Sequence, residues 1–165
     1  MPTNWFNSDG LYVKFGANEA TAGVAGEYNT LGARRCIEIR IADLTTIPDT
    51  TQTILDQNVW MPDNARIEEI EVINTTAATG SGATLDLGLI RFDQSTELDY
   101  DGLLANAPLT DWDTLGETKS YSVGVTGAGA LMGTVITQPG YFVATYDTAA
   151  FTAGALRIRV WYSFP

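Results

Sequence analysis

Short segments in which apolar and polar residues alternate recur along the chain and predict β-strands. In residues 35–41 three isoleucines share one face, and Cys36, Glu38 and Arg40 share the other. The same alternation returns in residues 83–93 and 156–164. A period of two is typical of strands that bury one face and expose the other. Further extended segments are residues 10–16, 51–62, 65–75, 119–125, 131–137 and 141–146.

The number and spacing of these segments predict an all-β fold. Eight or nine short strands are separated by turn signals, and no amphipathic helix interrupts them. This pattern is typical of a single antiparallel β-sandwich or a jelly-roll-like domain. We expect residues 83–93 to pair with the strand before them. We expect the last three strands to form an antiparallel meander with a tight turn at Pro139 and Gly140.

Two places depart from simple alternation. The adjacent polar residues Glu68 and Glu69 predict a β-bulge, or a late strand start at Glu69. Residues 93–118 carry seven acidic side chains and no basic one, around a segment (residues 101–109) that could make one short helical turn. We therefore expect an acidic loop region there.

The domain organisation follows from the length and from the position of the first strand. A chain of 165 residues is long enough for one domain with a sizeable core. The sequence predicts a β-sandwich domain over residues 10–165 and an N-terminal arm over residues 1–9. Trp5 and Phe6 in this arm could hook a neighbouring subunit, or the arm could fold back on its own domain.

The composition excludes several classes of catalytic site. The chain has no histidine and a single cysteine, Cys36, which is expected to be a small strand residue. Zinc sites built from His and Cys are therefore excluded, as are Ser-His and Cys-His catalytic pairs. No glycine-rich phosphate-binding motif occurs. We expect no catalytic residues, no cofactor and no enzymatic activity.

The charge of the chain bears on its partners. A net charge of −11 repels nucleic-acid phosphates and anionic lipids, so neither nucleic acid nor membrane is an expected partner. The sequence has no 18-residue apolar segment and no secretion signal, which predicts synthesis in a cytoplasm. Arginine outnumbers lysine seven to two, which indicates positive charges that serve in contacts.

The acidic residues suggest one possible metal site. Asp99, Asp101, Asp111 and Asp113 are hard oxygen ligands of the kind that calcium prefers. Their spacing does not match a twelve-residue calcium loop, and the alternative is an exposed acidic loop without a metal.

The C-terminal strand suggests an interaction surface. Its alternation places Arg157, Arg159 and Trp161 on the face opposite its apolar residues, and interfaces are enriched in arginine and tryptophan. The alternative is that these arginines pair with acidic residues of neighbouring strands. Trp60 and Trp112 could stack on sugar rings, or they could pack in the core or at a subunit interface.

Taken together, several segments resemble small structural proteins of tailed bacteriophages. They are "SDGLYVKFG" (residues 8–16), "MPDNARIEEIEV" (residues 61–72), "GSGATLDLGLIRFD" (residues 80–93) and "PGYFVATYDTAAFTAGALRIRVWY" (residues 139–162). Within this class the chain is most similar to the β-sandwich proteins that decorate or cement the capsid.

The resemblance implies a virion structural protein that is synthesised in the host cytoplasm and added to the capsid exterior. It implies the major capsid protein as a partner and a homotrimer as the oligomer. The contacts would come from an extended arm and from the sandwich faces, here Trp5, Phe6, Arg157, Arg159 and Trp161. The alternative is a carbohydrate- or receptor-binding β-sandwich module of a phage tail or fibre.

Overall fold

The computed structural model describes residues 4–6, 12–14, 34–49 and 52–165. The chain divides into two compact units, Met1–Thr30 and Leu31–Pro165. In the first unit, β1 (Asn4–Phe6) and β2 (Tyr12–Lys14) form an antiparallel pair in which Trp5 lies opposite Val13. The predicted boundary between residues 1–9 and 10–165 therefore lies earlier in the sequence than the boundary between these units.

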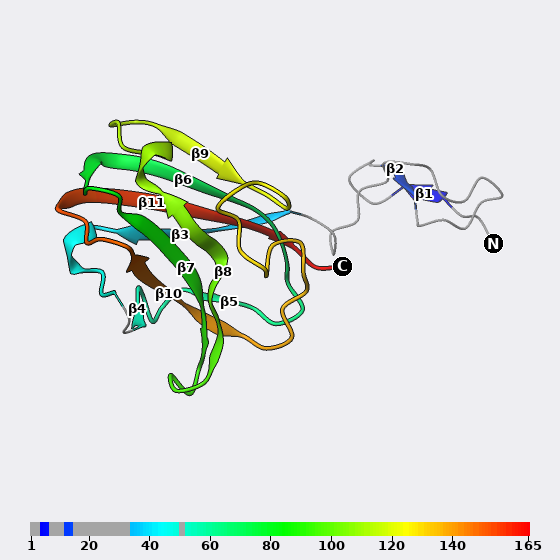
Figure 1. Ribbon diagram of the computed structural model, residues 1–165. Coiled ribbons are helices and arrows are strands. Elements are labelled where there is room, and N and C mark those ends of the chain that lie inside the picture. Colours follow the sequence, from blue (N-terminus) through cyan, green and yellow to red (C-terminus); the bar gives the residue numbers. More distant parts are fainter. Residues whose placement is uncertain (1–3, 7–11, 15–33, 50–51) are drawn as a thin grey trace. The chain divides into compact units, whose positions relative to one another are not determined.

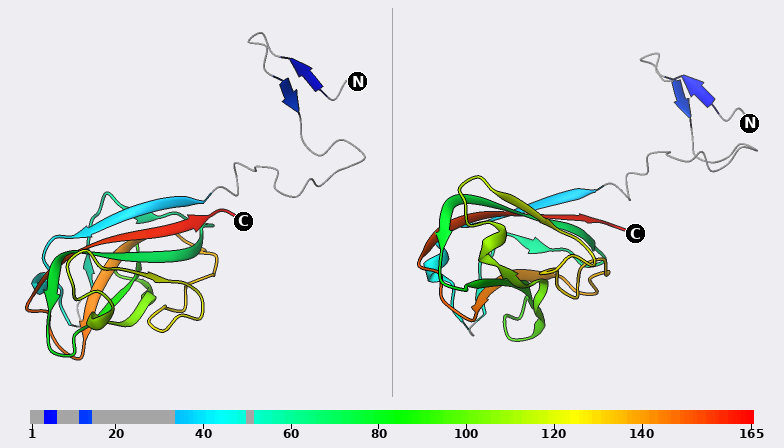
Figure 2. Two further views of the ribbon diagram at one scale, coloured as in Figure 1. Left: turned by 90° about the horizontal axis from the view of Figure 1, so that it is seen from above. Right: turned by 45° about the horizontal axis from the view of Figure 1, so that its top comes forward.

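The second unit is an antiparallel β-sandwich of a four-stranded and a five-stranded sheet, which the two further views show as separate layers (Figure 1, Figure 2). The four-stranded sheet has the order β3-β11-β6-β9. Its strands are β3 (Arg35–Ile41), β6 (Arg66–Thr79), β9 (Thr118–Tyr121) and β11 (Ala153–Ser163). No α-helix occurs among the described residues, and the all-β prediction with eight or nine strands is confirmed.

The five-stranded sheet has the order β4-β10-β7-β8, and β5 also pairs with β10. Its strands are β4 (Thr53–Ile54), β5 (Trp60–Met61), β7 (Thr84–Arg91), β8 (Glu97–Pro108) and β10 (Gly140–Asp147). Two single 3₁₀ turns, Leu44–Thr46 and Leu109–Asp111, connect strands at the ends of the sandwich.

The core lies between the sheets and is made by the inward residues of the alternating strands. Ile158 and Val160 of β11 and Leu85, Leu87 and Leu89 of β7 have no exposed surface. Burying such side chains contributes about 1.5–3 kcal/mol each relative to leaving them exposed. The residues between them must then point outward, because successive side chains of a strand alternate between faces.

The predicted irregularity in β6 is confirmed as a β-bulge. Trp161 lies opposite Glu69, whereas the next residue of β11, Tyr162, lies opposite Ile67, so Glu68 is the extra residue. The bulge lets both Ile67 and Ile70 lie on the buried face, although the two residues between them would put them on opposite faces of a regular strand.

The predicted strand connections are wrong in two places. Residues 83–93 do not pair with the strand before them, because β6 and β7 belong to different sheets. Residues 131–137 form turns rather than a strand, and β10 and β11 also lie in different sheets, so the C-terminal meander does not exist. The chain crosses from one sheet to the other at both of these connections, whereas consecutive strands more often lie next to each other in one sheet.

The acidic segment was also predicted wrongly in part, because it contains the twelve-residue strand β8. β8 lacks alternation since it bulges strongly against β7. Leu87 lies opposite Leu104 and Leu89 opposite Asp99, so five positions of β8 span two of β7. The helical turn expected within residues 101–109 is therefore wrong, because β8 runs to Pro108 and the 3₁₀ turn, Leu109–Asp111, follows it.

Gly88 makes this bulge possible, and its substitution tests the geometry. A Cβ at residue 88 would collide with the backbone of Asp99 and Tyr100, which a rotamer change cannot relieve. We expect Gly88→Ala to lower the free energy of unfolding by about 1–3 kcal/mol, the usual cost of overpacking. Denaturant unfolding would measure it, with exposed Ser81→Ala as the control. Equal stability of Gly88→Ala and the parent chain would contradict the close approach of β8.

Candidate functional site

The outward side of the four-stranded sheet carries interlocked arginine and glutamate side chains. We call this surface the arginine face. Its members are Arg34, Glu38, Arg40, Glu69, Glu71, Arg157, Arg159 and Trp161. The strand register arranges them in rows, so that Arg159 lies between Glu38 of β3 and Glu71 of β6.

Arg159 is the centre of the arginine face. Its guanidinium contacts Glu38 Oε2 at 3.4 Å and Glu71 Oε2 at 3.1 Å. Hydrogen bonds to Glu71 and Glu38 raise the pKa of Arg159 above its usual value. Desolvation alone would raise the pKa of Glu38, but hydrogen bonds from Arg159 and Arg40 outweigh it and lower that pKa. Arg159 and Glu38 therefore stay charged over the physiological range.

The neighbouring cations are held in the same way. Arg157 Nε lies 3.8 Å from Glu38 Oε2, is buried and donates no hydrogen bond among the described residues. The guanidinium of Arg34 stacks 4.7 Å from the ring centre of Trp161, and it also pairs with Glu69. The arginines of this face are thus paired with acidic neighbours, which is the second of the two alternatives left open by the sequence. A role in contacts with another subunit stays a prediction.

The four calcium candidates lie in two places. Asp111 receives a hydrogen bond from the Tyr121 hydroxyl at 3.2 Å and pairs with Lys119 at 3.4 Å, while Asp113 accepts a hydrogen bond from Thr114. Asp99 and Asp101 lie together on β8. Within the described ranges, no three acidic or cysteine side chains are grouped closely enough to hold a metal ion.

The two candidate sugar-stacking tryptophans differ in exposure. Trp112 has no exposed surface and packs against Phe151, so the suggestion that it stacks on sugars is wrong. Trp60 is 47% exposed and meets Phe92, which in turn packs on Tyr141 at a centroid distance of 4.7 Å. These three rings form a small exposed aromatic patch.

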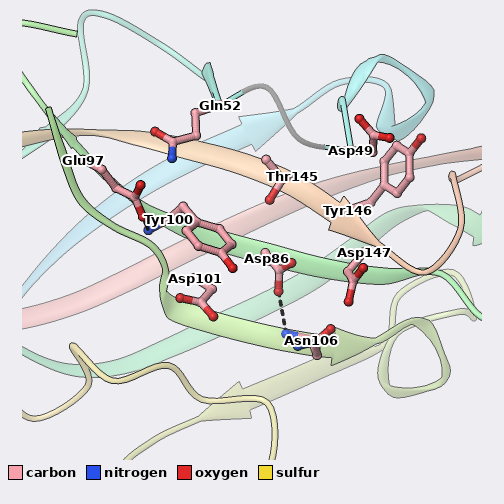
Figure 3. A pocket seen from close by; sticks show the side chains of 10 residues that line it. All are labelled: Asp49, Gln52, Asp86, Glu97, Tyr100, Asp101, Asn106, Thr145, Tyr146 and Asp147. Carbon is pink, nitrogen blue, oxygen red and sulfur yellow. Dashed lines mark hydrogen bonds between the residues drawn. The ribbon is translucent and has the colours of Figure 1, made fainter. Parts of the chain in front are cut away.

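A pocket of about 440 Å³ in the five-stranded sheet was not predicted (Figure 3). Ten side chains from β7, β8, β10 and the segment around β4 line it, and none of the ten is an arginine or lysine. Five of them are carboxylic acids: Asp49, Asp86, Glu97, Asp101 and Asp147. We call this surface the acidic pocket.

Asp86 is the most buried carboxylic acid of the acidic pocket, with 4% of its surface exposed. Its Oδ1 accepts a hydrogen bond from the backbone N–H of Asn106 at 2.6 Å. Burial raises the pKa of Asp86, and the charges of Asp101 and Asp147 add to this effect despite the Asn106 hydrogen bond. Nearby, burial and the neighbouring Asp101 raise the pKa of Asp99 to about 6.

The sequence held one signal for this pocket. Asp86 interrupts an otherwise apolar strand, "LDLGLI", at a position where the alternation only indicated an outward residue. Most other members come from β8, which was interpreted as a loop, and from β10, which was assigned to the wrong neighbours, and two come from the segment around β4. Their convergence depends on the sheet order and could not be read from spacing.

Comparisons with known proteins give two structural matches. A chain in the capsid asymmetric unit of cyanophage Pam1 matches with a TM-score of 0.56 and 17% sequence identity, over 90% of this chain and 97% of that one. A chain in the capsid of Ralstonia phage GP4 matches with a TM-score of 0.54 and 13% identity, over 84% and 88% of the two chains. No protein-family model matches the sequence, and no curated protein resembles it at a significant level.

These matches show that the β-sandwich resembles chains of phage capsids in fold. In the part of the chain that is described, no helix is long and apolar enough to cross a membrane.

The raised pKa of Asp86 has a consequence for stability. A carboxyl group whose pKa is higher in the folded than in the unfolded state destabilises the fold above that pKa, and this cost disappears as the pH falls towards the unfolded value near 3.9. We therefore expect Asp86→Asn to raise Tm near pH 8, by roughly 2–4 °C if the relief is ~1 kcal/mol.

This gain should shrink as the pH falls towards 4, because protonation of Asp86 in the folded chain removes the cost of its buried charge. Thermal unfolding followed by circular dichroism between pH 4 and 8 measures the effect. Asp63→Asn is the matched control, because Asp63 is exposed and lies outside the acidic pocket. If the Tm gain of Asp86→Asn over the parent chain were smaller at pH 8 than at pH 4, the raised pKa of Asp86 would be contradicted.

Proposed function

We propose that this chain is a non-enzymatic virion structural protein that binds the capsid exterior of a phage and stabilises it. The observation that carries the proposal is the likeness of its fold to two chains of phage capsids, over 84% or more of this chain. The protein would be synthesised in the host cytoplasm and assembled on the particle afterwards. Its net charge of −11 is consistent with a position away from the packaged nucleic acid.

The arginine face supplies the contact surface in this proposal. Arg157, Arg159 and Trp161 project from β11. Glutamates of β3 and β6 hold the two arginines, and Arg34 stacks on Trp161, so these side chains have defined positions before any subunit binds. Such preorganisation reduces the entropy lost on binding. Arginine and tryptophan also supply much of the binding energy at interfaces.

The N-terminal unit supplies a second contact in the proposal. Trp5 and Phe6 lie on β1, and Leu31–Pro165 forms a compact unit without them. We propose that they engage a neighbouring subunit, either the major capsid protein or another copy in a homotrimer. A typical interface buries about 800 Å² per partner. Repetition over a shell then multiplies a modest affinity by avidity.

Rebinding to capsids that lack the protein tests this function. We expect the purified chain to bind them and to raise their resistance to heat and osmotic shock. The double variant Arg157→Gln/Trp161→Ala should bind at least tenfold more weakly, which corresponds to ~1.4 kcal/mol. Arg91→Gln, on β7 of the other sheet, is the matched control and should bind normally.

Two results of this experiment would count against the proposal. Failure of the parent chain to bind or to co-purify with particles would exclude a capsid-stabilising role. Normal binding by the double variant would leave the capsid role standing but exclude the arginine face as its contact surface.

A second candidate is a carbohydrate- or receptor-binding module of a phage tail or fibre. The exposed aromatic patch favours it, since Trp60, Phe92 and Tyr141 contact one another at the surface. This function predicts glycan binding that Trp60→Ala abolishes. A glycan array without any bound sugar would exclude it.

A further inference from the structure

The acidic pocket and the arginine face belong to different sheets, and their charges are balanced in different ways. On the arginine face, Glu38, Glu69 and Glu71 each have a guanidinium partner. In the acidic pocket, Asp86 and Asp101 form no ion pair with any cation of the described residues. These two carboxylates therefore place negative charge in the pocket that no cation of the described residues neutralises.

Asp86 is a buried carboxylate that can accept more hydrogen bonds than the one it receives. It lies on β7 opposite Thr145 and faces the pocket (Figure 3). Its Oδ1 is occupied by the Asn106 N–H, but its Oδ2 has no hydrogen-bond donor among the described residues. A carboxylate that is only 4% exposed is costly unless donors or a cation satisfy it. The unused oxygen thus points to a ligand that donates hydrogen bonds and carries positive charge.

The size and lining of the pocket indicate an organic cation rather than a metal ion. About 440 Å³ is far more than a bare ion needs, and the described carboxylates do not group into a metal-binding set. Tyr100 and Tyr146 place two aromatic rings beside the carboxylates, and aromatic faces attract cations. A guanidinium is planar, donates in pairs to carboxylates and stacks on such rings.

We propose that the acidic pocket receives an arginine side chain presented by another protein subunit, with its guanidinium bound to Asp86 and Asp101. The affinity of the pocket for a guanidinium does not depend on the function proposed above. The claim that this guanidinium comes from a neighbouring capsid subunit does rest on the proposed capsid function. The pocket would then be a second contact, on the sheet opposite the arginine face.

The cation preference is tested with a small probe, N-acetyl-arginine amide, by NMR titration of the full chain at pH 7.5 and low salt. We expect saturable shifts of residues around the pocket and no saturation with the neutral analogue N-acetyl-citrulline amide. Spermidine tests the other source of organic cations. If spermidine bound at least tenfold more tightly than the arginine probe, a free polyamine would replace the protein side chain as the ligand.

Variants localise the site. Asp86→Asn and Asp101→Asn should each weaken binding of the arginine probe at least tenfold, and Asp63→Asn should not change it. Thermal unfolding of each variant confirms that it is folded before the titration. Absence of saturation with the parent chain, or equal affinity of the parent and both pocket variants, would overturn the proposal.

Capsid rebinding separates the two proposals. If the parent chain binds the arginine probe but not the capsid, the pocket stands and the capsid function fails. If the parent chain binds the capsid and Asp86→Asn/Asp101→Asn binds it equally well, the capsid function stands and the subunit arginine is excluded.

Discussion

The packing of the two sheets against each other is the constraint on which both surfaces depend. Because the side-chain period of a strand is two, burial of Ile158 and Val160 forces Arg159 outward, and burial of Leu85 and Leu87 forces Asp86 outward. A register shift of one residue would turn the arginines into the core. The aliphatic contacts between the sheets therefore fix which polar residues can meet a partner.

The two surfaces differ in how their partly buried charges are compensated. On the arginine face every described carboxylate has a guanidinium within 4 Å, and Arg159 is shared between two of them. In the acidic pocket Asp86 is buried beside Asp101 and Asp147, and all three would be negative when ionised. A group that lowers the stability of the fold is retained more readily when it serves in binding. This contrast is the physical reason to assign the pocket a ligand from outside the chain.

The sequence predicted the strands whose alternation is regular, and it failed where the backbone departs from it. Residues 35–41 form β3 as expected, and the doubled glutamates marked the bulge at Glu68. The strand β8 was missed because its bulge over Gly88 breaks the period of two. The sheet order was missed because β6 and β7, and likewise β10 and β11, follow each other in sequence but lie in different layers. The acidic pocket needs both features, so no local pattern could reveal it.

A consequence for assembly follows from the way each surface is balanced. The arginine face has internal ion pairs, so its geometry is set before binding, and a partner must match it in shape. Asp86 and Asp101 instead form no ion pair among the described residues, so a cation from a partner would be their counter-charge and added salt would compete with that contact directly. If both surfaces bind capsid subunits, raising the salt concentration would weaken the pocket contact first. The protein would then stay attached to the particle through the arginine face alone before it dissociates.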